Sequence, residues 1–177
     1  NGPQLGRPCL VRFIVMAASS RRYIDLDLKY GAHNYAPLPV VLARGKGIFV
    51  WDVAGRRYFD MLSAYSALNQ GHCHPKIAAA ARAQLGRLTL TSRAFHNTLM
   101  GPFLKKLCAL TGMPKAILMN SGAEAVETAI KAMRLWGYRR KGIAPNQAEI
   151  IVAHGNFHGR TTTIVGFSSD PDSYEGF

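Results

Sequence analysis

The residues best suited to chemistry are the small and polar ones of the segment Asn-Ser-Gly-Ala-Glu-Ala-Val-Glu-Thr-Ala, residues 120–129. Ser121 and Glu124 stand three residues apart, the spacing of a capping box that satisfies free backbone N–H groups at the start of a helix. The turn between them exposes further N–H groups at the positive end of a helix dipole, which suits an anion and most often a phosphate. An ordinary capped helix that binds nothing has the same pattern, and the motif alone favours that interpretation.

A second polar loop, residues 154–160, follows the apolar run at residues 149–153, just as the first follows the apolar run at residues 116–119. Short apolar runs without alternation indicate strands of a parallel sheet that is buried on both faces. Ligands of open α/β sheets bind beyond the carboxyl ends of the strands. The two loops are therefore predicted to share one site.

Two side chains of the second loop are candidates for ligand binding. Phe157 could stack on a flat ring, and Arg160 could hold a carboxylate through its forked guanidinium group. A core position for Phe157 and a plain surface charge for Arg160 are the alternatives, and the residues themselves leave both open.

The periodicity of apolar residues predicts the elements that position these loops. Strand–helix–strand order indicates a parallel α/β sheet with right-handed crossovers, and only two of its strands are recognisable, so we expect an incomplete sheet. An antiparallel hairpin is predicted where two aromatic, β-branched runs flank a short turn. The predicted segments are a short helix or extended arm at 25–35, the hairpin at 48–62, and helices from Pro75, from about Leu99 to Leu110, from Gly122 to near Gly137, and from near Thr161.

Composition narrows the function classes. The 177 residues carry a net charge of +12, but no nucleic-acid-binding motif accompanies it, so no nucleic-acid partner is predicted. No apolar run approaches the roughly 20 residues of a membrane-spanning helix, so no membrane partner is predicted. Three dispersed cysteines without a CxxC pair indicate a reducing compartment. His72-Cys73-His74 offers metal-ligand types, but a structural zinc site needs four ligands, so no metal is predicted.

Several longer segments of the chain resemble the ornithine aminotransferases, a class III, fold-type I family that depends on pyridoxal 5'-phosphate (PLP). The resemblance runs from about Tyr23 to the last residue without an evident gap. One departure is Ala36, where the family usually has histidine. The resembling segments are residues 30–35, 63–75, 88–95, 119–129, 155–160 and 170–177.

The resemblance implies an α/β fold, the large-domain sheet of the fold-type I PLP-dependent transferases. This sheet would be incomplete here and preceded by an amino-terminal arm and a β-hairpin of the small domain. The implied division is a leader, upstream or transit-like segment at 1–22, the arm and hairpin at 23–70, and the first part of the PLP-binding large domain at 71–177.

The resemblance also implies roles for individual residues. The backbone N–H groups of Gly122 and Ala123 would hold the PLP phosphate, and Phe157 would stack on the pyridine ring. Arg160 and Tyr35 would hold the carboxylate end of the substrate, while Tyr65 would favour ornithine over γ-aminobutyrate. The complete set is Ser121, Gly122, Ala123, Phe157 and His158 for the cofactor and Tyr35, Tyr65 and Arg160 for the substrate.

The family reaction moves the δ-amino group of L-ornithine to 2-oxoglutarate, giving glutamate 5-semialdehyde and glutamate. No lysine here stands in the context of the family's aldimine lysine, so no catalytic residue is predicted and the chain alone is expected to be an inactive amino-terminal fragment of a homodimeric enzyme. The expected location is the cytoplasm, with the mitochondrial matrix as the alternative. The competing hypotheses are an acetylornithine- or γ-aminobutyrate-type aminotransferase, a non-catalytic basic anion-binding module, and an orphan fragment that aggregates through exposed sheet edges.

Overall fold

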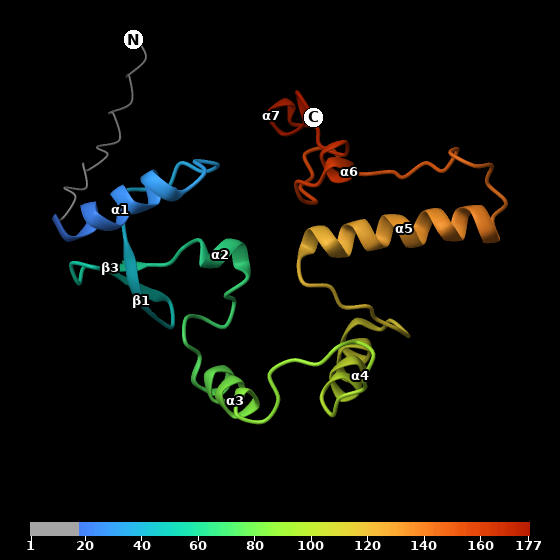
Figure 1. Ribbon diagram of the computed structural model, residues 1–177. Coiled ribbons are helices and arrows are strands. Elements are labelled where there is room, and N and C mark those ends of the chain that lie inside the picture. The colour runs from blue at the N-terminus through green and yellow to red at the C-terminus, as the bar shows by residue number, and fades with distance from the viewer. Residues whose placement is uncertain (1–17) are drawn as a thin grey trace, which may run out of the picture. The chain divides into compact units, whose positions relative to one another are not determined.

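The computed structural model describes residues 18–177, which form two compact units, residues 18–92 and residues 93–177 (Figure 1). Residues 1–17 of the expected leader segment lie outside the described residues, and residues 18–22 belong to the first helix. Among the described helices, none is both long enough and apolar enough to cross a lipid bilayer.

The first unit consists of a helix, a three-stranded antiparallel sheet and two further helical segments. The strands lie in the order β1-β2-β3, and the pairing of β2 with β3 confirms the predicted hairpin. Strand β1 was not predicted, because its sequence Leu-Ala-Arg-Gly-Lys lacks an apolar alternation; it forms by pairing with β2. The elements are α1 (Ala18–Tyr30), β1 (Leu42–Lys46), β2 (Phe49–Asp52), β3 (Arg57–Phe59), α2 (Ser63–Ser66) and α3 (Pro75–Leu85).

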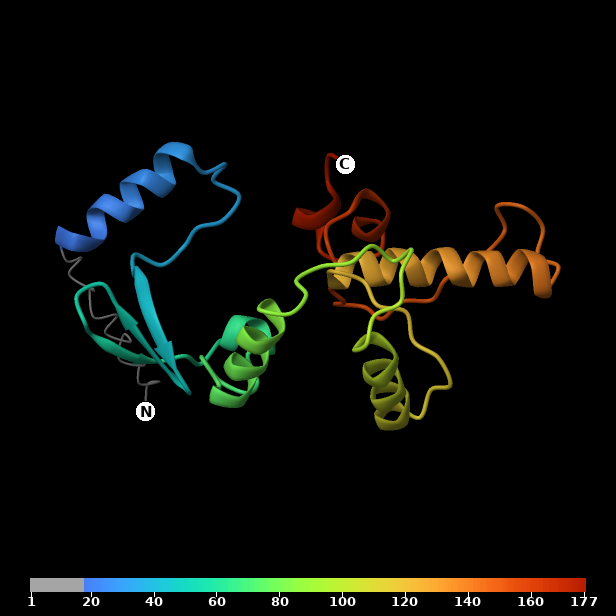
Figure 2. The ribbon, with the colours of Figure 1, turned by 60° about the horizontal axis from the view of Figure 1, so that its bottom comes forward.

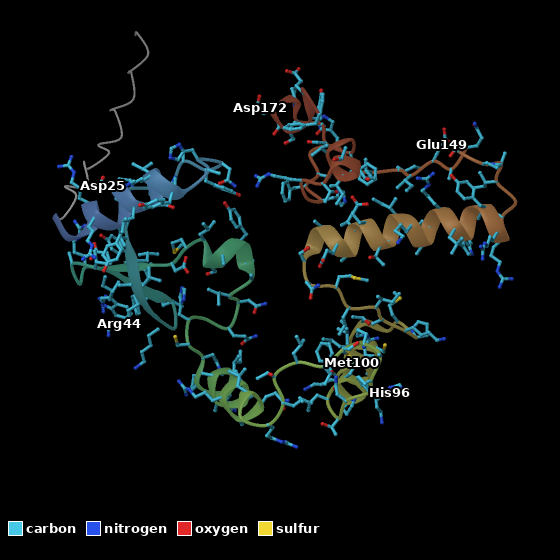
Figure 3. All side chains as sticks on the ribbon, in the orientation of Figure 1. Asp25, Arg44, His96, Met100, Glu149 and Asp172 are labelled. Atoms are coloured by element: carbon cyan, nitrogen blue, oxygen red, sulfur yellow. The ribbon has the colours of Figure 1, made fainter. Side chains whose placement is uncertain are left out.

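One face of this sheet carries aromatic rings beneath cationic side chains. The rings of Phe49 and Phe59, which are paired across β2 and β3, have centroids 4.8 Å apart. The guanidinium of Arg44 on β1 lies 3.9 Å from the centroid of the Trp51 ring (Figure 3). Such contacts combine apolar burial with attraction between a cation and the ring face, so they hold the three short strands together.

The hairpin turn is closed by the buried carboxylate of Asp52. Its Oδ1 accepts the N–H groups of Ala54 and Arg56, both at 2.9 Å. Its Oδ2 accepts from Nε of Arg56 at 2.7 Å and from the hydroxyl of Tyr58 at 2.8 Å. Burial would raise the pKa of Asp52, but the hydrogen bonds from Arg56, Tyr58 and Ala54 outweigh it and lower the pKa from 3.8 to about 2.

We expect acid to destabilise the first unit through Asp52. A carboxyl whose pKa is lower in the folded state stabilises that state fully above its unfolded pKa, and this contribution is lost as the pH falls from about 4 towards 2. The thermal unfolding midpoint, followed by circular dichroism, should fall across this window and should fall less in Asp52→Asn. Asp25→Asn on exposed α1 is the control (Figure 3). If the unfolding midpoint became equally insensitive to pH in both variants, this role of Asp52 would be contradicted.

The second unit is helical, and its elements are α4 (Met100–Thr111), α5 (Gly122–Arg140), α6 (Thr162–Val165) and α7 (Pro171–Tyr174). Helices α3, α4, α5 and α6 confirm the predicted ones, with Pro75 at the first position of α3. After α5 the chain turns and runs back along that helix to its N-terminal end (Figures 1 and 2). The buried apolar side chains of this unit belong to α5 and α6: Ile130, Ile164 and Val165.

The prediction of two parallel strands is wrong for this structure. Residues 116–119 and 149–153 are irregular, and within the described part of the chain neither segment pairs with another strand. Ile117 is 74% exposed and Ile151 is 99% exposed. A β-strand exists only through hydrogen bonds to a neighbour, so an apolar run without such a neighbour stays irregular.

Candidate functional site

The N-terminus of α5 has the predicted capping box. Oγ of Ser121 accepts the N–H of Glu124 at 3.2 Å, and Oε2 of Glu124 accepts the N–H of Ser121 at 2.9 Å. The same Oε2 accepts the N–H of Asn120 at 2.8 Å. The two side chains thus fix where the helix begins and how the chain enters it.

The first two N–H groups of α5 belong to Gly122 and Ala123, and no acceptor among the described residues binds either one. A Cβ atom placed on Gly122 would meet nothing within 4 Å, so the space beside Gly122 is open. Two unpaired donors at the positive end of a 19-residue helix can bind an anion in that space.

We expect loss of the cap to destabilise α5. Ser121→Ala removes the acceptor for Glu124 N–H and should cost about 1 kcal/mol of unfolding free energy, as Ser-to-Ala changes at such caps do. Ser121→Asn retains a capping oxygen and serves as the control. Urea denaturation measures the difference, and equal midpoints for the two variants would show that the cap contributes nothing.

The loop before α6 is attached to the first two turns of α5. Gly159 has a φ of +134°, and a Cβ atom there would lie 2.9 Å from Cβ of Ala123. Oγ1 of Thr161 donates to Oε1 of Glu127 at 2.5 Å. The second predicted loop therefore does reach the end of α5 where the free N–H groups lie. Gly159 and Glu127 were not singled out from the sequence, although a glycine between two candidate residues was a usable signal.

The side chain of Asn156 stabilises the same loop by hydrogen bonds to the backbone. Its Nδ2 donates to the carbonyl oxygens of Ala153 at 2.6 Å and Phe167 at 2.8 Å. Because both acceptors are carbonyls, Oδ1 of Asn156 is the acceptor in its contact with Nδ1 of His158, at 2.7 Å. His158 thereby carries its proton on Nδ1, and its ring meets that of Phe167 edge-on. Asn156 was not predicted from the sequence as a site residue.

Phe157 and Arg160 lie together on this loop. Phe157 is 71% exposed, and the guanidinium of Arg160 lies 5.4 Å from the centroid of its ring. Arg160 also lines a cavity of about 500 Å³ together with Asp170 and Asp172 of the α7 region. An exposed ring face beside a guanidinium can bind a planar ligand and an anionic group side by side.

The two predicted tyrosines belong to the first unit, whereas the other six predicted site residues belong to the second. Tyr35 follows α1 in an irregular segment and is 55% exposed, and Tyr65 lies in α2 and is 75% exposed. His72 of the His-Cys-His triplet is engaged by Asp60, whose Oδ2 lies 2.6 Å from Nε2 of His72.

Comparison with known proteins gives consistent results. The family model described as Aminotransferase class-III matches residues 30–177. An ornithine aminotransferase of Bordetella pertussis is 60% identical over 161 residues, which is 91% of this chain and 39% of that relative. The chain thus spans about two fifths of the length of the curated relatives it matches.

Solved structures agree with these matches. An ornithine aminotransferase from Toxoplasma gondii, with partial occupancy of PLP at its active site, has a TM-score of 0.87 and 44% identity, covering 89% of this chain and 37% of that one. An acetylornithine aminotransferase from Elizabethkingia anophelis has a TM-score of 0.75 and 59% identity, covering 86% of this chain and 38% of that one. These similarities confirm the expected fold class.

Proposed function

Because the chain belongs to the class-III aminotransferase family, we propose that it supplies the phosphate-binding turn and the ring-covering loop of a PLP-dependent ornithine aminotransferase. The complete reaction would transfer the δ-amino group of L-ornithine to 2-oxoglutarate. The observation that carries this proposal is the open first turn of α5, with two unpaired N–H groups, against which the loop of Phe157 and Arg160 is packed.

The described residues fit PLP chemically. Its phosphate is a dianion of the kind that helix N-termini bind, and its flat pyridine ring matches the exposed face of Phe157. When bound, PLP supplies an aldehyde that combines with amino groups and a ring that withdraws electrons from them.

Each of the proposed cofactor-binding residues then has a definite role. Gly122 and Ala123 donate their N–H groups to the phosphate, while Ser121 keeps the helix start fixed. Phe157 covers one face of the ring and excludes water, and Asn156 holds His158 beside it through the Nδ1 hydrogen bond.

Charged and aromatic side chains would bind the substrate. Arg160 binds a carboxylate, since its planar fork matches the two oxygens. Tyr35 contributes a hydroxyl to the same end of the substrate, and Tyr65 selects for L-ornithine as the amino donor. We further propose a homodimer, and a location in the cytoplasm or the mitochondrial matrix.

The test is an activity assay on the complete polypeptide that carries this chain. Purified with PLP, it should form glutamate 5-semialdehyde from L-ornithine only when 2-oxoglutarate is present. Absence of turnover with L-ornithine, while PLP is bound, would refute the proposed donor.

Acetylornithine is the second candidate donor, because the Elizabethkingia anophelis structure is a 59% identical acetylornithine aminotransferase. The ratio of kcat/KM for L-ornithine to that for N-acetylornithine decides between the two. A ratio well above one supports the ornithine assignment, and a ratio well below one replaces it.

A further inference from the structure

A run of left-handed residues sits in the first unit, at the segment that carries Tyr65. The backbone φ angles of residues 63–66 are 48°, 49°, 54° and 68°, and none of these residues is glycine. L-residues avoid this conformation because Cβ crowds the following carbonyl oxygen. Four in succession persist only where the surrounding structure holds them.

Asp60 holds the beginning of this turn. Its Oδ1 accepts the N–H of Ser63 at 2.8 Å and that of Leu62 at 3.2 Å, and Oγ of Ser63 donates to the carbonyl oxygen of Asp60 at 3.2 Å. Asp60 is itself attached to the sheet, because its N–H donates to the carbonyl of Ile48 at 2.9 Å. The turn is thus connected to the hairpin through Asp60, by its carboxylate and by its backbone carbonyl.

The other oxygen of Asp60 engages His72, whose Nε2 donates to Oδ2 at 2.6 Å. The hydrogen bond to Ser63 N–H, followed by the one from His72, lowers the pKa of Asp60 and keeps the carboxylate charged. Both oxygens are therefore occupied, one by the turn and one by the histidine.

His72 is in turn fixed against the first strand. Its N–H and carbonyl both pair with Gly47, at 2.8 and 2.9 Å. Its ring lies so close to Gly45 that a Cβ atom there would be 2.6 Å from Cγ of His72. The position of the ring, and with it the direction of its Nε2–H, is thus set by β1 and by Gly47 directly after it.

We propose that Asp60 and His72 are positioning residues that hold the left-handed turn of residues 63–66 and so orient Tyr65 toward the amino donor. Tyr65 is 75% exposed in the middle of this turn, where it is available to a ligand. The role of Tyr65 as a donor contact rests on the proposed function, whereas the control of the turn rests on the contacts above.

The kinetic test is a double-mutant cycle in the complete PLP-bound polypeptide. Asp60→Ala should raise the KM for L-ornithine about tenfold and leave the KM for 2-oxoglutarate within about twofold, because a displaced aromatic contact weakens donor binding. In a Tyr65→Ala background the same change should have no further effect on the ornithine KM, since residues that act through one another are not additive.

Two substitutions of His72 test whether its hydrogen bond to Asp60 is what matters. The terminal amide of glutamine can donate a hydrogen bond from its Nε2 much as Nε2 of histidine does, so His72→Gln should keep the ornithine KM near that of the wild type. His72→Ala should behave like Asp60→Ala. A full Asp60→Ala effect in the Tyr65→Ala background, or no rescue by glutamine, would overturn the proposal.

A second measurement does not depend on activity. The backbone ¹³C chemical shifts of residues 63–66 report left-handed φ angles in the wild type and should move toward ordinary values in Asp60→Ala and His72→Ala. If the turn stays left-handed in both variants, the positioning role is wrong, whatever the enzyme turns over. If the turn moves but the wild type does not use L-ornithine, only the proposed function fails.

Discussion

Replacing Gly159 by alanine is expected to weaken PLP binding roughly 100-fold. The new Cβ atom would lie 2.9 Å from Cβ of Ala123, and a φ of +134° is strained for any residue except glycine. Strain and overlap together cost about 3 kcal/mol, which corresponds to a factor of roughly 100 in affinity. The loop must then move away from the first turn of α5. Titration of the complete polypeptide with PLP, followed by its absorbance, measures the loss.

Gly155→Ala is the matched control for this prediction. Gly155 lies in the same loop and also has a positive φ, of +69°, but a Cβ atom there would meet nothing within 4 Å. It should therefore show only the smaller cost of a left-handed alanine, about 1 kcal/mol, or roughly a fivefold loss. Equal losses in the two variants would mean that the contact between Gly159 and Ala123 does not matter for the cofactor.

Replacing Arg160 by alanine is expected to raise the KM for L-ornithine about 100-fold while changing PLP affinity by less than about threefold. A guanidinium that binds a carboxylate through two parallel hydrogen bonds is hard to replace, so Arg160→Lys should recover only part of the loss. Steady-state kinetics of the complete polypeptide with varied L-ornithine is the measurement. Arg139→Ala, in the last turn of α5, is the control for loss of a positive charge.

Unchanged kinetics in Arg160→Ala would remove Arg160 from the substrate site. A proportional loss of PLP affinity would instead assign its main role to the Phe157 ring, which its guanidinium already faces. The two outcomes are separated by measuring PLP affinity and KM on the same preparation.

Local features of the structure could be predicted from the sequence. The start of α5 was predictable because the capping box involves residues only three apart, and both of its hydrogen bonds are present. The hairpin was predictable because its turn and its two aromatic strands are contiguous. In each case the partners that determine the conformation are visible within a short window.

Features that depend on distant partners could not be predicted in this way. Thr161 and Glu127 are 34 residues apart, so the sequence around either residue does not indicate their hydrogen bond. Strand β1 forms through its register with β2, and the apolar runs at 116–119 and 149–153 resemble strands although no described segment pairs with them.

The left-handed turn around Tyr65 was also not predicted, because its own residue types do not indicate it. Its sequence, Ser-Ala-Tyr-Ser, contains neither glycine nor asparagine, the usual residues of that conformation. Asp60 lies only three residues before Ser63, but His72, which engages the other oxygen of Asp60, is 12 residues away from it along the chain.

The most direct test of the account is a crystal structure of the complete polypeptide grown with PLP. We predict that the phosphate oxygens accept hydrogen bonds from the N–H groups of Gly122 and Ala123, with the ring of Phe157 against the pyridine. A phosphate seated away from the first turn of α5 would contradict the assignment of this site.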